Sequence, residues 1–199
     1  MWFFFRFLIA HHIQKIQPNT PLLDWVITRY RVRLWDIDAN LHMNNVKYLK
    51  YLEKGRVEHM IHTPWLQAML QGGFKALIAN TEISYVKELK PWQRFKVETR
   101  ISGWDDKYVY IEQLFTYKRT VFTAAVIRMA MVATKSRKRV SPAQVLAEAF
   151  PDIQPPPVPP SALALNQLVA AQREETQAIA DAHAAQDEND NSNPQEVQS

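Results

Sequence analysis

Acid–base side chains are concentrated in one short stretch of this sequence. Between Asp36 and Asn45 lie two carboxylates, one histidine and three asparagines. Carboxylates and imidazoles serve as general bases or nucleophiles, and asparagine side chains orient water or a carbonyl group. The stretch separates a strand-like run (26–34) from a helix-like run (46–61), and a helix N-terminus presents unpaired N–H groups and partial positive charge. We therefore predict a catalytic or ligand-binding loop at this joint.

The sequence signals no serine or cysteine nucleophile. It contains no cysteine, which excludes disulfides, thiolate nucleophiles and cysteine-based zinc sites and is compatible with a reducing compartment. The G-x-S-x-G motif of a serine nucleophile elbow does not occur. The carboxylates and the histidine of the polar stretch therefore remain the candidate reactive groups.

One further cluster has the spacing of metal ligands on a helix, Glu58-His59-x-x-His62. A zinc site needs at least three protein ligands, and the sequence shows no third ligand for this pair of histidines. We therefore interpret the cluster as a polar helix face, and we expect neither a metal nor a cofactor.

The elements around the loop predict an α+β fold. The run 26–34 alternates apolar and basic residues, as a half-buried strand does, and the helix after it would begin with Asn44 or Asn45 as N-cap. Gly55 inside that helix suggests that another backbone passes close by. A short second helix (65–70) precedes four strands, 74–86, 91–104, 108–117 and 121–134. This order predicts an antiparallel sheet packed on one main helix, with the last four strands in a meander.

The polar stretch resembles the signature of the hotdog-fold thioesterases. The matching residues are Asp36, Asp38, Asn40, His42, Asn44, Asn45 and Tyr48. Their pattern is closest to the catalytic segment of plant acyl-ACP thioesterases, and the wider relatives include acyl-CoA and 4-hydroxybenzoyl-CoA thioesterases. The resemblance implies a curved antiparallel sheet wrapped around a long central helix. It also implies a homodimer or homotetramer, with sheets joined edge to edge and active sites at the interface.

The resemblance also implies roles for individual residues. Asp38 matches the catalytic aspartate, which would act on water as a general base or attack the carbonyl directly. Asn40 would orient the water or the carbonyl, and His42 would bond Asp38 or share its proton. The backbone N–H groups of Asn45 and Val46 would stabilise the oxyanion. Alternatively, these polar residues only shape the loop and cap the helix.

Other residues of the stretch receive structural interpretations. We expect Asp36 to pair with an arginine or brace the loop, and Asn44 to cap the helix. The bacterial short-chain acyl-CoA thioesterases carry a histidine where this chain has Asn45. The acyl-ACP family also uses a glutamate on the next strand, for which Glu82 is a candidate. The hotdog hydratases offer a second reading, but their glycine and proline are missing here.

Charge and composition divide the chain. Residues 1–150 hold 23 Lys/Arg against 12 Asp/Glu, whereas residues 151–199 hold one Arg against eight Asp/Glu. A basic body suits a polyanionic ligand such as coenzyme A, and no RNA-recognition motif is present, so we expect no nucleic acid. The predicted parts are an apolar N-terminal segment (1–20), the hotdog domain (21–140), a short helix and Pro-rich linker (141–160), and an Ala/Gln-rich helix with an acidic disordered tail (161–199).

The apolar segment 1–10 is too short to span a bilayer. It would pack on the core or on a partner subunit, or lie in a membrane surface. The basic run 135–139 would be solvated, or would contact phosphates or a membrane.

Two functions follow. The first is an acyl thioesterase of fatty acid metabolism, acting on acyl-CoA before acyl-ACP, cytoplasmic or peripheral to the inner face of a membrane. The second is a non-catalytic acyl-CoA-binding or membrane-associated hotdog module.

Overall fold

The computed structural model describes residues 20–192, so the apolar segment 1–10 lies outside the described residues. The chain forms two compact units that meet at Pro160. The first contains all strands and most helices, and the second is the single helix α5 (Pro160–Ser192). None of the described helices is long and apolar enough to cross a membrane.

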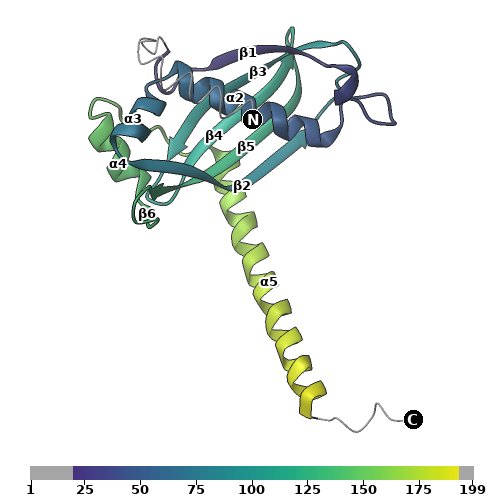
Figure 1. The fold of residues 1–199 in the computed structure, drawn as a ribbon, viewed down its shortest axis with the longest axis vertical. Helices are drawn as coiled ribbons and strands as arrows, with labels where there is room; N and C mark the ends of the chain where they lie inside the picture. Colours follow the sequence, from purple (N-terminus) through teal and green to yellow (C-terminus); the bar gives the residue numbers. More distant parts are fainter. Residues whose placement is uncertain (1–19, 193–199) are drawn as a thin grey trace. The chain divides into compact units, whose positions relative to one another are not determined.

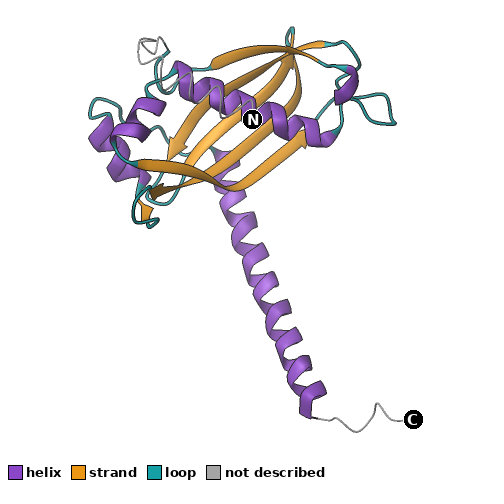
Figure 2. Ribbon diagram, viewed as in Figure 1, coloured by secondary structure: helices purple, strands orange, loops and turns teal. Residues whose placement is uncertain are grey.

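The first unit is an antiparallel sheet packed on one long helix (Figures 1 and 2). The sheet order is β1 (Val26–Arg31), β3 (Arg94–Trp104), β4 (Val109–Tyr117), β5 (Thr120–Ala133) and β2 (Phe74–Tyr85), and β6 (Arg139–Val140) pairs with β5. Helix α2 (Asn45–His62) lies against one face of this sheet. The predicted α+β architecture, an antiparallel sheet on one main helix, is therefore confirmed. The expectation that the last four strands form a simple meander is wrong, because β2 pairs with β5 at the sheet edge and β3 pairs with β1.

Aromatic rings fill the space between α2 and the sheet. The ring of Tyr51 meets Phe95 edge-on at 5.0 Å, Phe95 stacks on Phe115 at 5.5 Å, and Tyr48 lies 5.1 Å from Phe115. The helix positions that face the core are Tyr48, Tyr51, Leu52, Gly55, Glu58 and His59. Leu49, although apolar, is exposed. The buried face includes a glycine and a histidine, so its apolar pattern is incomplete in the sequence.

The close approach expected at Gly55 exists, but it involves side chains rather than a backbone. A Cβ atom on Gly55 would lie 2.7 Å from Val97 Cγ1 and Gln113 Nε2 and 2.8 Å from Thr99 Oγ1. The buried amide of Gln113 donates to Leu52 O at 2.9 Å and to Thr99 Oγ1 at 2.8 Å. The helix is therefore held against β3 and β4 by a polar network as well as by apolar packing.

Several boundaries differ from expectation. Strand β1 ends at Arg31 instead of residue 34, because a 3-10 helix (Leu34–Asp36) follows, with Leu34 and Trp35 exposed. The basic run 135–139 is a turn that leads into β6. Helix α3 (Trp65–Gln71) occurs where predicted, and so does α4 (Pro142–Ala149), which is capped by Ser141. Helix α5 includes residues 187–192, which we had expected to be disordered.

Candidate active site

The polar loop between β1 and α2 is a tight turn that brings its two ends together. Ile37 and Met43 form an isolated antiparallel bridge. Inside it, the Asp38 N–H donates to His42 O at 3.1 Å, and the Leu41 N–H donates to Asp38 O at 3.1 Å. Leu41 has a φ of 60°, the left-handed conformation that closes the turn. As a result, the side chains of Asp38 and His42 lie next to each other at the base of the turn.

Asp38 is held by the loop but remains accessible to solvent. Its Oδ1 accepts a hydrogen bond from the Asn40 N–H at 2.9 Å, and the same oxygen lies 3.7 Å from His42 Nδ1. Its side chain is 23% exposed. None of the described residues donates a hydrogen bond to the second carboxylate oxygen. That oxygen can therefore accept a proton from water or approach an electrophilic carbon.

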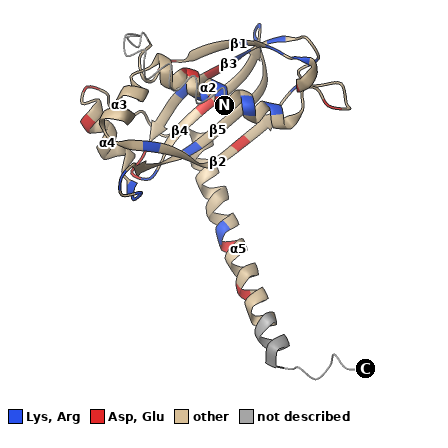
Figure 3. Ribbon diagram, viewed as in Figure 1, with Lys and Arg blue, Asp and Glu red and all other residues tan. Residues whose placement is uncertain are grey.

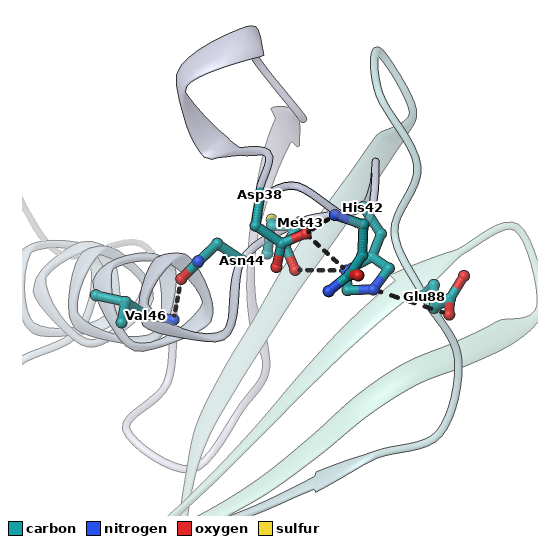
Figure 4. Close-up of polar contacts among 7 residues, drawn as sticks. Asp38, His42, Met43, Asn44, Val46 and Glu88 are labelled. Atoms are coloured by element: carbon teal, nitrogen blue, oxygen red, sulfur yellow. Dashed lines mark hydrogen bonds and ion pairs between the residues drawn. The ribbon is translucent and has the colours of Figure 1, made fainter.

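His42 lies between two carboxylates (Figure 4). Its Nδ1 is 3.4 Å from Met43 O and 3.7 Å from Asp38 Oδ1, and its Nε2 is 4.0 Å from Glu88 Oε1. An imidazole placed between two acids can take a proton from one side and release it on the other. The structure thus brings together Asp38 and His42, as the sequence suggested, and adds Glu88.

Asp36 braces the loop. Its carboxylate is buried and accepts hydrogen bonds from the Arg33 N–H at 2.9 Å and from the Tyr51 hydroxyl at 2.8 Å. Its charged partner is Lys47, whose Nζ lies 3.8 Å away, instead of the arginine side chain we had considered. Burial and the adjacent carboxylate raise the pKa of Tyr51, so the tyrosine remains a hydrogen-bond donor. The bracing role predicted for Asp36 is therefore confirmed.

The start of α2 is capped by Asn44, as predicted. Its Oδ1 accepts a hydrogen bond from the Val46 N–H at 2.9 Å (Figure 4). This bond engages one of the two N–H groups that we had assigned to the oxyanion site. Val46 could serve there only if the Asn44 side chain rotated away. The Asn45 N–H belongs to the first helical residue, which has no carbonyl four positions earlier within the helix.

Sequence reasoning missed Glu88 and proposed Glu82 instead. Glu82 lies within β2, where its Oε1 accepts from the Ser84 hydroxyl at 3.0 Å. Glu88 follows the end of that strand and is brought to the loop because the Met43 N–H donates to Leu89 O at 2.8 Å. The one sequence signal for Glu88 was that it is the first carboxylate after the strand. Its position in the sequence does not indicate that it will contact the loop that carries His42.

The metal-like cluster on α2 is not a polar face. His59 is buried, and burial lowers its pKa to about 4, whereas His62 Nε2 lies 3.5 Å from Glu58 Oε2. Within residues 20–192, no group of three His, Cys, Asp or Glu side chains is arranged to hold a metal ion.

A group of apolar residues that could hold an acyl chain lies at the far end of α2. Trp65 and Phe74 belong to the core, with ring centroids 6.0 Å apart. Leu66 and Met69 border a cleft of about 650 Å³ beside α3. The 18 residues of α2 separate this cleft from Asp38 by about 27 Å at 1.5 Å per residue. The cleft is therefore not adjacent to the candidate catalytic residues within one chain.

Comparison with known proteins places the chain in a thioesterase-like family. The family model for the thioesterase-like superfamily matches residues 32–166. Protein THEM6 of Xenopus laevis is 33% identical over 128 residues, which cover 64% of this chain and 62% of that protein. Protein THEM6 of Danio rerio is 31% identical over 147 residues, covering 73% of this chain and 71% of that protein.

Solved structures confirm the hotdog fold. A probable thioesterase of Escherichia coli superposes with a TM-score of 0.59 at 21% identity, covering 62% of this chain and 95% of that one. A Staphylococcus aureus protein solved in complex with CoA superposes with a TM-score of 0.54 at 16% identity, covering 71% of this chain and 94% of that one.

Proposed function

The chain belongs to the thioesterase-like superfamily, and on this premise we propose that it hydrolyses the thioester of acyl-CoA to a free acid and a thiol. The observation that supports this proposal is the placement of Asp38, a partly exposed carboxylate 3.7 Å from His42 at the start of α2. Two relatives of the chain, from yeast and Penicillium oxalicum, are named as thioesterases. The structurally similar S. aureus protein was solved in complex with CoA, so acyl-CoA is our first candidate substrate and acyl-ACP is the second.

We assign to Asp38 the reaction at the carbonyl carbon of the thioester, and it can perform this reaction in two ways. As a general base it removes a proton from water, and the resulting hydroxide attacks the thioester. As a nucleophile it forms an acyl anhydride and releases the thiolate, and water then hydrolyses the anhydride. Both routes break the C–S bond and transfer a proton to the departing thiolate. In the nucleophilic route this happens as the anhydride forms, before water hydrolyses it. Both routes require an ionised carboxylate with one oxygen directed at the substrate.

The neighbours of Asp38 supply orientation and proton transfer. His42 orients Asp38 and shares its proton, and Glu88 positions the imidazole from the opposite side. The Asn40 side chain orients the attacking water or the carbonyl. The Asn45 N–H stabilises the oxyanion with help from the partial positive charge of the helix start.

We further propose that two chains join through β2 to form a homodimer. This edge strand has twelve residues, and Leu77, Ile78 and Tyr85 on it are large exposed hydrophobic residues. An unpaired apolar edge readily pairs with another strand. Tyr85 packs against Tyr48 and is three residues from Glu88, so a partner at β2 would also border the active site. Light scattering on the purified chain measures this association.

Thiol release from a panel of acyl-CoA esters tests the function. The variant Asp38→Asn is nearly isosteric and removes the carboxylate, and we expect it to lose activity about 10²–10⁴-fold. The variant Asp24→Asn is the matched control, because Asp24 is exposed in the loop before β1 and should leave the rate unchanged. Circular dichroism confirms that both variants are folded.

The outcomes separate the alternatives. Turnover by the wild type that Asp38→Asn loses and Asp24→Asn keeps would support the assignment. Turnover that survives in Asp38→Asn would mean that another group performs the chemistry. Binding of acyl-CoA without turnover on either carrier would show a non-catalytic binding module.

A further inference from the structure

Strands β1 and β3 place like charges directly opposite each other. In their antiparallel register Arg29 pairs with Lys96, and Arg31 pairs with Arg94. Positions two apart share a face of the sheet, so these four residues form one patch, which we call the cationic quartet. Like charges in opposed positions destabilise a strand pair. Two adjacent pairs of this kind indicate that an anion normally lies against them.

The quartet is part of a larger basic cleft. The cleft has a volume of about 850 Å³, and seven of its twelve lining residues are Lys or Arg, with none acidic. Arg33, Lys54 and Lys118 complete the basic set, contributed by the loop after β1, by α2 and by the β4–β5 turn. Basic residues recur along β1, β3 and α2 in Figure 3.

Two carboxylates beside the cleft residues in the chain or in the strand register are bonded to other groups. Glu98 lies one row farther along β3, opposite Ile27, and accepts from the Thr116 hydroxyl at 2.6 Å. Asp36 is held by Tyr51 and Lys47. The cleft therefore keeps a strong positive potential, which attracts anions.

Large apolar side chains are exposed at Trp35, which lines the cleft, and at Leu34 and Trp92, which lie within two positions of cleft residues in the chain. Leu34 is 63% exposed, Trp35 is 69% exposed, and the Arg33 guanidinium lies 5.9 Å from the Trp35 ring centre. The Trp92 side chain is 52% exposed, and its backbone N–H donates to Val32 O at 3.2 Å. Its φ of 62° is unusual for a bulky residue. Tryptophan beside Lys and Arg is typical of surfaces that enter the headgroup region of a bilayer.

We propose that the basic cleft binds the phosphate groups of an anionic lipid surface, with Leu34, Trp35 and Trp92 inserted among the headgroups. The quartet is largely exposed, which suits many phosphates on a surface better than one enclosed phosphate. Nucleic acid would bind the basic residues and stack its bases on the tryptophans, but it has no apolar region in which an exposed leucine would be buried. The quartet itself lies on β1 and β3 and contains no residue of the turn that carries Asp38 and His42.

Vesicle co-sedimentation of the full chain tests the proposal. Vesicles of phosphatidylcholine alone are compared with vesicles that also contain phosphatidylserine, so that any charge-independent binding by residues 1–10 appears in both. The quadruple variant replaces the quartet with glutamine. The control replaces Lys50, Lys75, Lys107 and Arg173 with glutamine, which removes the same charge from exposed positions outside the cleft and outside the basic run 135–139.

We expect the wild type to prefer anionic vesicles, with a preference that weakens as salt is raised. The quartet variant should lose at least about tenfold in that partition, and the control variant should lose far less. A Leu34→Ser/Trp35→Ser variant keeps every charge and should also bind more weakly.

Four results would overturn the proposal. The first is equal loss in the quartet and control variants, which would indicate unspecific charge. The second is the absence of any preference for anionic vesicles. The third is quartet-dependent binding of RNA without vesicle binding. The fourth is a raised KM for acyl-CoA in the quartet variant with vesicle binding unchanged, which would assign the cleft to the phosphates of the substrate.

Discussion

Burial of His59 makes the stability of this protein depend on pH. The imidazole is 2% exposed on the core face of α2, and its pKa falls to about 4 from the ordinary value of 6.5 because the charged form is desolvated. Between these two values the unfolded chain binds a proton that the folded chain does not. Stability is therefore complete above pH 6.5 and decreases as the pH falls toward 4.

The size of the effect follows from the two pKa values. One unit of difference corresponds to about 1.4 kcal/mol, so the full shift to about 4 amounts to about 3 kcal/mol. Linkage between these two pKa values gives a loss of about 2 kcal/mol between pH 7.5 and pH 5. This is a large fraction of the stability of an ordinary domain, about 5–15 kcal/mol.

Urea denaturation at several pH values measures the loss. The wild type is compared with His59→Leu, which removes the titrating group from the core, and with His62→Gln, which removes a partly exposed histidine near the same helix end. We expect the wild type and His62→Gln to lose stability in parallel below pH 6.5. His59→Leu should have lower stability at neutral pH but a flatter profile. Parallel profiles for all three proteins would refute the assignment of the pH dependence to His59.

Two further predictions concern the seating of α2. Gly55→Ala should lower the free energy of unfolding by about 2 kcal/mol. The added methyl group would crowd Val97, Thr99 and Gln113, and this cost outweighs the gain of about 1 kcal/mol in helix propensity. Urea denaturation measures the change, and a stabilised variant would contradict the packing argument. Tyr51→Phe should cost about 1.5–3 kcal/mol by removing a hydrogen bond to the buried carboxylate of Asp36; an unchanged urea midpoint would show that Arg33 and Lys47 suffice to hold that carboxylate.

The sequence was sufficient for the main elements and for the loop that carries Asp38 and His42. Both residues belong to one turn of five residues, so short-range spacing already places them together. The cap by Asn44 and the brace by Asp36 also depend on near neighbours in the chain or on the following helix. The last long strand was predicted from its β-branched residues in spite of its apolar composition, and β5 confirms it.

Features set by long-range pairing were missed. Glu88 meets His42 across 46 positions because the segment after β2 bonds to Met43, and no local pattern reports that contact. The end of β1 was misplaced because alternation continues past Arg31, whereas Val32 bonds to the loop at residues 92–93 and the chain then turns. The basic cleft arises from the register of two strands more than sixty positions apart, which composition indicates only as net charge.

The two edges of the sheet are unequal, and this bears on how large an assembly can become. One edge is the long apolar β2, and the other is the six-residue β1 with arginines along it. A self-complementary contact through β2 would use that edge in both copies and leave a β1 strand at each outer end of the joined sheet. Two such ends would repel each other, since each presents the same positive charge. Association through sheet edges would therefore stop at the dimer. The β2 edge favours pairing of two chains, whereas the positively charged β1 edges prevent further chains from adding to form a filament.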